Sequence, residues 1–469
     1  MVIEQPVEIT IEDWEKTPSA VQEYIARQVA ELQDAQERLG QNSQNSSRPP
    51  SSDSPDQKKS EKKNKPKQRK QGGQPGHPGH KRELKPVEEV DEVIAVKPEI
   101  CRHCGTELEG EDAQPHRHQV TEIPPVEPTV TEYQLHTLNC GECGGKTRAE
   151  LPVGVPSRAF GPRLQSIVSM ASGVYRMSRR QVEQMMNDFF KVELSLGTVK
   201  NLEEDTSKAV AEPVEEAKEY VKEQKQANLD ETSWKQGAEK GWMWVMVTHW
   251  VVVFVIRLSR GSKVAQELLG EQFKGVVNSD RYSAYNWLPV KLRQLCWAHL
   301  IRNFQAFVDY GGQSTRLGQG LLSKTELMFA WWYKLKDGEI DRAEFQEKMK
   351  TIRPKIVDLL KEGAVGEHQK TAGSCAHILK FEPALWTFIE VEGIEPTNNE
   401  AEREIRCGVI WRKTSFGTQS EAGSIFVERM LTVTATLKRQ DRNVLDYLTE
   451  ACLARLYKLP APSLLPQES

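Results

Sequence analysis

Residues 228–232 read Asn-Leu-Asp-Glu-Thr and end a predicted β-strand with an acidic pair. Two apolar, β-rich runs follow at 242–248 and 251–258, and the short break between them predicts an antiparallel hairpin. A predicted helix at 262–269 leads to a further strand at 275–278, which is followed by another aspartate. These elements come in the order β, β, β, α, β. In a mixed sheet of that order, the first and fourth strands can be neighbours.

The two strand-end aspartates, Asp230 and Asp280, would then lie together at one edge of the sheet. Carboxylates are the ligands that Mg²⁺ prefers, because it takes hard oxygen donors. A third carboxylate is expected from a polar, helix-forming run far downstream that contains Glu400, Glu402 and Glu404. Side chains two residues apart diverge by about 200° around a helix. Glu400 and Glu404 therefore share a face while Glu402 points elsewhere, and spacing alone leaves open which one faces the metals.

The length and charge of the chain bound its class. With 469 residues it is too long for one ordinary core, so two or more domains are expected. Its net charge is only −4, but residues 58–70 are almost purely basic, which indicates a local nucleic-acid footprint. The N-terminus lacks the basic and apolar regions of a secretory signal, and the longest apolar run, 251–256, is too short to span a membrane. The sequence predicts a soluble, cytoplasmic protein.

Four of the eight cysteines stand in two Cys-x-x-Cys pairs, Cys101 with Cys104 and Cys140 with Cys143. Two such knuckles supply four thiolates for tetrahedral Zn²⁺, and in a reducing compartment this pattern favours a metal over disulfides. Bound zinc would replace a core that so small a segment cannot form. Its role would be structural, because four thiolates leave no open coordination position. A mixed site stays open, since three histidines lie nearby: His103, His116 and His118.

The N-terminal region predicts one helix and a segment without a core. In the predicted helix at 20–39, Ile25, Leu32 and Leu39 recur every seven residues. This spacing fits either a short coiled-coil seam or a single amphipathic helix that docks on the rest of the protein. Residues 41–85 are rich in Ser, Asn, Pro, Gly and Lys and cannot build a core. We interpret them as a linker that also contacts DNA phosphates nonspecifically.

Two further regions are predicted to be helical. Residues 161–221 contain Ser178 and Ser195 as predicted N-caps. A short helix, a turn and a second helix that opens near Ser195 suggest a helix-turn-helix, with an ordinary helical bundle as the alternative. Residues 297–389 are mostly helical and predict an all-helical insertion.

Four basic residues and one histidine are candidates for contacts with DNA. Arg403 and Arg406 could hold phosphates, since a guanidinium grips them bidentately. Arg412 and Lys413 begin a basic run beside a Gly turn, which either contacts the DNA backbone or forms a solvated loop. His299 is a weaker candidate, because a lone histidine is more often structural than catalytic.

Taken together and in order, the motifs of this chain resemble those of the bacterial DDE transposases of the insertion-sequence-sixty-six family. The resemblance covers nearly the whole length, and the set is highly specific although each motif alone is weak. The motifs are Gln-Asn-Ser-Gln-Asn-Ser-Ser at 41–47, Pro-Pro-Ser-Ser-Asp at 49–53, Gly-Gly-Gln-Pro-Gly-His at 72–77, the two Cys-x-x-Cys pairs, Leu-Asp-Glu-Thr at 229–232, Ser-Asp-x-Tyr at 279–282, Cys-Trp-Ala-His at 296–299 and Asn-Asn-x-Ala-Glu-Arg at 398–403.

The resemblance implies an RNase H-like catalytic domain with a helical insertion before the last carboxylate. It implies Asp230, Asp280 and Glu402 as the catalytic triad that binds two Mg²⁺ ions, because the family's glutamate directly precedes an arginine. Family members typically act alongside small accessory proteins encoded in the same element. The chain departs from the family's usual residues at three positions, which are Arg281 in place of Gly, Thr397 in place of Asp and Thr414 in place of Asn.

The predicted fold class is multidomain α+β with an RNase H-like α/β catalytic domain. The predicted divisions are an N-terminal coiled-coil-like helix (1–40), a disordered basic linker (41–86), a zinc-ribbon-like domain (87–156), a helical DNA-binding region (157–222), the catalytic domain (223–430) with its helical insertion at about 300–390, and a C-terminal helical region (431–469).

The predicted function is that of a DNA transposase, which would cleave element ends and join the 3′-OH to target DNA with divalent metal. Its expected partners are DNA, further copies of the chain and the accessory proteins, with no membrane. One alternative is a nuclease that cuts without strand transfer. Another is a zinc-dependent DNA-binding regulator whose acidic residues are only caps and turns.

Overall fold

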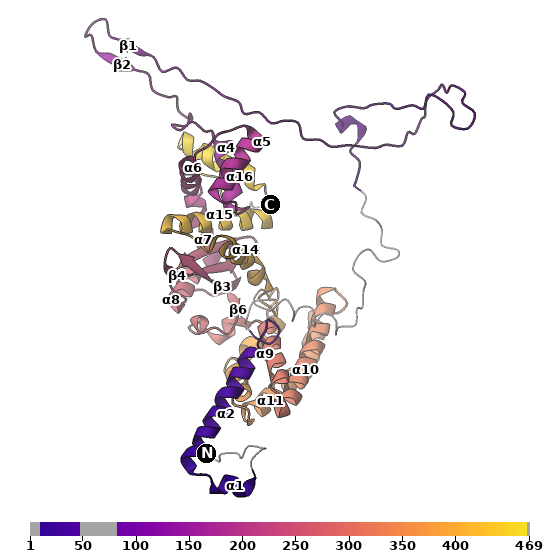
Figure 1. Ribbon diagram of the computed structural model, residues 1–469, viewed down its shortest axis with the longest axis vertical. Helices are drawn as coiled ribbons and strands as arrows, with labels where there is room; N and C mark the ends of the chain where they lie inside the picture. Colours follow the sequence, from indigo (N-terminus) through magenta and orange to yellow (C-terminus); the bar gives the residue numbers. More distant parts are fainter. Residues whose placement is uncertain (1–9, 47–81, 467–469) are drawn as a thin grey trace. The chain divides into compact units, whose positions relative to one another are not determined.

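The computed structural model of the protein describes residues 10–46 and 82–466 (Figure 1). The predicted basic run at 58–70 and the glycine-rich motif at 72–77 lie outside these residues. The described residues fall into two compact units, one that includes 82–127 and one that includes 10–46 and 128–466, and each is described by itself. In the parts described, no helix is long and apolar enough to cross a membrane.

The smaller unit has little regular secondary structure. A 3₁₀ turn spans Val87–Glu89, and an isolated antiparallel bridge joins Ile100 to Glu107. In the larger unit, β1 (Thr137–Asn139) and β2 (Lys146–Arg148) form a short antiparallel hairpin whose residues are all exposed. Burial of apolar surface therefore contributes little to either of these segments, as expected where a bound metal replaces a core.

Two helices, α1 (Ile11–Lys16) and α2 (Ser19–Leu39), form the described N-terminal part, and the second confirms the helix predicted at 20–39. Near its end, α2 contacts α12 (Gln369–Leu379), where Lys370 Nζ lies 2.8 Å from Asp34 Oδ1. Helix pairing between protomers stays a prediction. Several apolar side chains of α2 are exposed, among them Val21, Val29, Leu32 and Leu39.

A group of helices precedes the sheet. Both predicted N-caps are confirmed, because Ser178 Oγ accepts the N–H of Gln181 and Ser195 Oγ accepts the N–H of Thr198. The last helix of the chain, α16 (Val444–Tyr457), packs back against this group. The helices of the group are α4 (Pro162–Gly173), α5 (Arg179–Phe190), α6 (Leu196–Ala209) and α7 (Ala211–Lys222).

The central sheet has five strands in the order β5-β4-β3-β6-β7. Strands β3, β4 and β5 form an antiparallel meander, whereas β6 runs parallel to β3 and β7 runs parallel to β6. The predicted hairpin, and the predicted neighbourhood of the first and fourth strands, are confirmed. The strands are β3 (Gln226–Gln236), β4 (Glu239–Val247), β5 (Val252–Arg257), β6 (Val276–Ser279) and β7 (Arg293–Leu295).

One expectation about this sheet was wrong. Strand β3 does not end at the acidic pair but continues to Gln236, because Glu231 to Gln236 pair with Trp244 to Glu239 of β4. Asp230 therefore lies inside a strand, where it pairs with Val245 of β4, two residues beyond the last pair between β3 and β6. The helix predicted at 262–269 is confirmed as α8 (Ser262–Leu269), which connects the meander to β6.

Helix α15 (Glu421–Arg439) covers the free edge of the sheet at β5 and satisfies its backbone. Every second residue of β5 points its N–H group toward α15. Every fourth residue of α15 accepts one of these N–H groups with its side chain. A strand rises about 6.6 Å in two residues and a helix about 6 Å in four, so the two spacings match. The N–H groups of Val252, Phe254 and Ile256 donate to Thr436 Oγ1 (3.1 Å), Thr432 Oγ1 (3.0 Å) and Glu428 Oε1 (2.6 Å).

Residues 297–390 are mostly helical, as predicted, and pack around a hydrophobic cluster that also includes Val276 and Leu295 of the sheet. Within it, the Trp332 ring lies edge-on to Phe345 and Phe388, with ring centroids 5.8 and 5.4 Å apart. The helices α10 and α11 lie side by side (Figure 1). The helices of the insertion are α9 (Trp297–Asp309), α10 (Gly312–Lys336), α11 (Arg342–Ala364), α12, and the short 3₁₀ and α turns Glu382–Leu385 and α13 (Thr387–Glu390).

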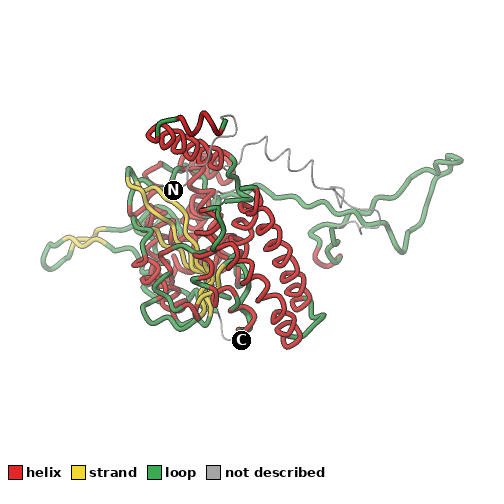
Figure 2. The backbone as a smooth tube through the Cα atoms, turned by 90° about the horizontal axis from the view of Figure 1, so that it is seen from below, coloured by secondary structure: helices red, strands yellow, loops and turns green. Residues whose placement is uncertain are grey.

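After the insertion, α14 (Asn399–Ser415) returns to the sheet and packs against β3 and β4. Figure 2 shows the strands of the central sheet among helices. The predicted domain boundary at residue 430 falls inside α15, which is continuous from Glu421 to Arg439.

We predict that Thr432→Val will lower the free energy of unfolding by about 1–3 kcal/mol, because the buried N–H of Phe254 loses its acceptor. Thr434→Val, on the same helix, is the matched control. Thr434 Oγ1 is buried and has no hydrogen-bond partner among the described residues, so its removal should be neutral or stabilising. Urea unfolding followed by circular dichroism compares the two, and equal losses would contradict the edge-covering role of α15.

Candidate active site

Asp230 and Asp280 occupy matching positions on neighbouring parallel segments. In the ladder between β3 and β6, Asn228 pairs with Asn278, and each aspartate follows two residues later. Because side chains two residues apart along an extended chain point to the same face, both carboxylates leave the sheet on one face. Asp230 lies inside β3 opposite Val245, whereas Asp280 directly follows the end of β6.

The start of α14 is tied to these two strands by paired asparagine side chains. Asn398 Nδ2 donates to the backbone carbonyl of Leu229 on β3 at 2.6 Å. From β6, Asn278 Nδ2 donates to the carbonyls of Glu395 (2.7 Å) and Thr397 (3.3 Å). Both amides are buried, so these bonds are shielded from water. They hold the first turn of α14 beside the two aspartates. Thr397 takes part through its backbone only.

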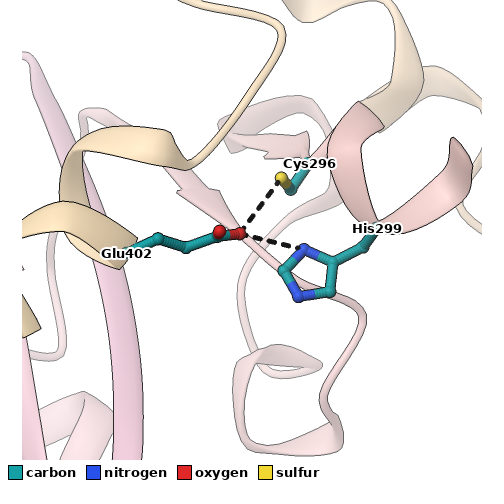
Figure 3. Close-up of side chains that lie close together, drawn as sticks. All are labelled: Cys296, His299 and Glu402. Atoms are coloured by element: carbon teal, nitrogen blue, oxygen red, sulfur yellow. Dashed lines mark hydrogen bonds and ion pairs between the residues drawn. The ribbon is translucent and has the colours of Figure 1, made fainter. Parts of the chain in front are cut away.

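The three glutamates of α14 separate as helix geometry requires. Glu400 and Glu404 both pair with Arg439 of α15, at 3.3 and 3.4 Å. Glu402 points the other way, and its Oε1 lies 3.5 Å from His299 Nδ1 (Figure 3). Of the three, Glu402 therefore shares the site with the aspartates.

The carboxylates repel one another at this point. Burial raises the pKa of Asp230 well above its usual range, and the negative charges of Glu231, Asp280 and Glu402 raise it further. Groups that far apart in the sequence influence Asp230 because β3, the end of β6 and α14 bring them together. A bound cation would relieve this repulsion, and a set of carboxylate oxygens suits Mg²⁺. The three side chains, Asp230, Asp280 and Glu402, are thus of the chemical type that a hard divalent metal binds.

The segment that carries Asp280 is held by hydrogen bonds to its own backbone. The N–H of Tyr282 donates to Asp280 Oδ1 at 2.8 Å, which orients the carboxylate. The carbonyl of Asp280 accepts from Arg293 Nη2 at 3.2 Å. Arg293 is fully buried on β7, and burial lowers its pKa to about 10 although Asp280 opposes the shift. A buried cation thus lies behind the acidic site.

A second arginine, Arg260, holds the same segment from the side of the hairpin. Its guanidinium lies 3.8 Å from the ring centroid of Tyr282 and 4.6 Å from that of Trp242. Glu231 Oε1 accepts from its Nε and Nη2 at 2.9 and 2.7 Å, and Glu231 Oε2 accepts from the hydroxyl of Tyr285 at 2.6 Å. Sequence patterns did not predict this network, although the acid next to Asp230 was a visible signal.

Arg281 connects the same segment to the helical insertion. Its Nη2 donates to Asn303 Oδ1 on α9 at 2.7 Å, and its Nη1 lies 3.1 Å from His377 Nδ1 on α12. Burial lowers the pKa of Arg281, and Asp280 opposes that shift. The Arg281 side chain therefore has defined partners on two helices.

The predicted DNA-contacting residues divide into exposed and internal groups. Arg403, Arg406 and Lys413 are exposed on α14 and are free to meet a ligand from solvent. Arg412 is half-buried, and its Nη1 donates to Ser233 on β3. Of the two interpretations of the run at 412–417, the solvated loop does not hold for residues 412–415, because they complete α14.

His299 is turned inward, toward the carboxylates. It lies on α9 one turn from Cys296, and Glu402 reaches both from α14 (Figure 3). Arg302, on the next turn of α9, places Nη2 3.5 Å from Glu402 Oε2. His299 is therefore a neighbour of the metal-type site rather than part of an exposed basic surface.

The two Cys-x-x-Cys pairs form the same turn, each within its own unit. The N–H of Cys101 donates to Thr106 O at 2.8 Å, and the N–H of Gly105 donates to Cys101 O at 2.9 Å. In the second turn, the N–H of Cys140 donates to Gly145 O at 2.8 Å, and that of Gly144 donates to Cys140 O at 3.0 Å. Gly105 and Gly144 have φ of 75° and 68°, which glycine adopts without strain. Both turns match zinc knuckles.

We predict that Glu231→Gln will make stability less dependent on pH. The pKa of Glu231 is raised from 4.5 to about 7, mainly by burial and by Asp280. An acid whose pKa is raised on folding stabilises the folded state at low pH. The free energy of unfolding of the wild type should therefore fall by up to about 3 kcal/mol between pH 5 and pH 8, whereas that of the variant should not. Urea unfolding in EDTA at both pH values measures this difference. An identical pH dependence in both proteins would contradict a buried, charge-strained Glu231.

Comparisons with known proteins agree with this arrangement. The model of the transposase IS66 family matches residues 159–425, and that of the zinc-finger binding domain of transposase IS66 matches residues 98–144. A family of unknown function, DUF6444, matches residues 6–83. The uncharacterized protein y4qI of Sinorhizobium fredii is 30% identical over 267 residues, which cover 50% of this chain and 48% of that protein. The chain thus spans about half the length of this relative.

The two transposase matches cover the cysteine pairs and the acidic residues separately. The zinc-finger match contains all four cysteines of the knuckles and supports a structural zinc there. The longer match contains the sheet, the helical insertion and α14, and with them Asp230, Asp280 and Glu402. The chain belongs to the transposase IS66 family.

Proposed function

We propose that the protein is a DNA transposase that cleaves the ends of its element and joins the new 3′-OH to target DNA. The observation that carries this proposal is the convergence of Asp230, Asp280 and Glu402 from β3, the end of β6 and α14. The sheet order, with an antiparallel meander beside two parallel strands, fits an RNase H-like catalytic domain. The family membership points the same way.

The three carboxylates would hold two Mg²⁺ ions. Bound there, the ions would activate the attacking oxygen and stabilise the leaving oxygen of a phosphodiester. The chain itself would mainly position groups: Asn398 fixes the start of α14, Tyr282 orients Asp280, and Arg260 holds Tyr282. Such preorganisation is how proteins stabilise charge in phosphoryl transfer.

The reaction would proceed in two displacements at phosphorus. Water attacks the phosphodiester at the element end, the phosphorus–oxygen bond to the 3′ oxygen breaks, and a 3′-OH is released. That 3′-OH then attacks a phosphodiester of target DNA in line. Arg403 and Arg406 are exposed on the helix that carries Glu402, where they can contact phosphates on either DNA.

The rest of the chain would bind DNA and assemble the complex. The zinc knuckles and the α5–α6 pair would contact the element ends, with the exposed Lys413 as a further phosphate contact. The exposed apolar side chains of α2 would pair protomers into a homo-oligomer. Small accessory proteins of the same element are further expected partners.

Asp230→Asn tests the proposed chemistry. The substitution removes a metal-binding charge but keeps the shape of the side chain, so end cleavage should be abolished while binding of end DNA is unchanged. Cleavage of labelled element-end DNA with Mg²⁺, alongside gel-shift binding, gives both readouts. Normal cleavage by the variant would overturn the assignment, and metal-independent binding alone would favour a regulator.

Glu402→Gln and Glu404→Gln form a matched pair on one helix. Only Glu402 faces the aspartates, so its substitution should lower the cleavage rate on the order of 1000-fold, as expected for loss of several kcal/mol of metal-based stabilisation. Glu404→Gln should stay within about threefold of wild type, since a partly exposed ion pair contributes little. Equal losses would argue against Glu402 as the ligand.

Joined products in the same assay separate a transposase from a nuclease.

A further inference from the structure

Cys296 brings a sulfur ligand atom, and His299 a nitrogen ligand atom, close to Glu402, which is proposed above as a magnesium ligand. Cys296 is the N-cap of α9 and His299 lies one turn along, so both side chains face α14 (Figure 3). Glu402 Oε1 lies 4.0 Å from Cys296 Sγ and 3.5 Å from His299 Nδ1. The ligand atoms of the three side chains all lie within 4.8 Å of one another.

These distances are close to those of a tetrahedral zinc site. With Zn–S near 2.3 Å and Zn–N and Zn–O near 2.1 Å, neighbouring ligand atoms are about 3.4–3.6 Å apart. Cys296 Sγ and the His299 nitrogen lie within 4.8 Å of each other, so side-chain adjustments of up to about 1 Å would complete the geometry. Three protein ligands also leave the fourth position open for water.

The site has an unmet need that a cation would satisfy. His299 Nδ1 is buried, and the structure gives it no hydrogen-bond partner among the described residues. The 3.5 Å approach to Glu402 is not a hydrogen bond, whereas the other carboxylate oxygen, Oε2, faces Arg302. Of the three atoms only His299 Nδ1 lacks a partner in the described chain, because Cys296 Sγ accepts the N–H of Asn398 at 3.2 Å and donates weakly to Glu402 Oε1 at 4.0 Å.

The ligand types select the metal. A thiolate and an imidazole are softer donors than the carboxylates of Asp230 and Asp280, and they favour Zn²⁺ over Mg²⁺. The charges also balance, because one thiolate and one carboxylate neutralise a dication. Burial raises the pKa of Cys296 to about 12, so its proton must leave to solvent as the metal–sulfur bond forms.

We propose that Cys296, His299 and Glu402 form a Zn²⁺ site, separate from the zinc knuckles, and that zinc bound there inhibits DNA cleavage by withdrawing Glu402 from the magnesium site. The binding part stands on the three side chains alone. The inhibitory part rests on the proposed function, since it requires Glu402 to serve Mg²⁺. Glu402 would then act as a switch between two metals of different softness.

The first experiment counts zinc without any assay of activity. Full-length wild-type protein, Cys296→Ser and Cys407→Ser are equilibrated at a series of buffered free Zn²⁺ concentrations, and bound zinc per chain is measured. Cys407 is the matched control, because it is a half-buried thiol on the same helix as Glu402. Wild type and Cys407→Ser should bind one zinc more than Cys296→Ser, and the knuckle zinc is common to all three.

A ligand lost directly should weaken this zinc at least about 100-fold, since even outer-shell partners are worth 10- to 100-fold. His299→Gln, counted in the same way, should lose the same zinc and guards against a folding defect specific to Cys296→Ser. Circular dichroism verifies that each variant is folded. Equal zinc contents for wild type, Cys296→Ser and His299→Gln at all free Zn²⁺ concentrations would overturn the site.

The second experiment measures inhibition. Zn²⁺ is titrated into Mg²⁺-dependent cleavage of element-end DNA, and each protein is compared with its own zinc-free rate. The half-inhibitory Zn²⁺ concentration should rise at least about 100-fold in Cys296→Ser and stay unchanged in Cys407→Ser. Unchanged inhibition in Cys296→Ser would overturn the regulatory role. If the wild type cleaves no DNA with Mg²⁺, the proposed function fails, while the zinc count still decides the site.

Discussion

The parallel pairing of β3 with β6 is the constraint on which the site depends. It aligns Asn228 with Asn278 and thereby sets Asp230 beside Asp280, although these aspartates are separated by the meander and α8. The same two strands hold α14 through the amides of Asn278 and Asn398. A one-residue slip in this ladder would turn the aspartates to opposite faces, because side chains alternate along a strand.

Charge is the cost of this arrangement, and the surrounding residues offset it without neutralising the carboxylates. Arg260 and Arg293 bind Glu231 and the carbonyl of Asp280, and neither is paired with the carboxylates of Asp230 and Asp280 in the described structure. The acidic site stays available to a cation because the arginines act on its supports. Arg439 forms ion pairs with Glu400 and Glu404 on the other face of α14, so that Glu402 is the glutamate of the three that faces the site.

The helical insertion also contributes to the site. Its first helix, α9, carries Cys296, His299 and Arg302 toward Glu402, and Arg281 reaches back to α9 and α12 from the segment after β6. Through these partners Arg281 couples the insertion to the aspartate segment, which a glycine at this position could not do. The insertion is therefore in direct contact with the candidate site rather than an appendage.

Local patterns in the sequence determined much of the fold. Alternating and continuous apolar runs marked the meander, capping residues Ser178 and Ser195 marked two helix starts, and helix periodicity separated Glu402 from Glu400 and Glu404, because these features depend on residues close in the chain. The family pattern singled out Glu402, which periodicity alone did not. Tertiary structure alone decided the length of β3, the inward direction of His299, the Glu231–Arg260 network and the covering of β5 by α15. Each of these depends on partners far apart in the sequence, and their hydrogen bonds and charges exist only after the chain has folded.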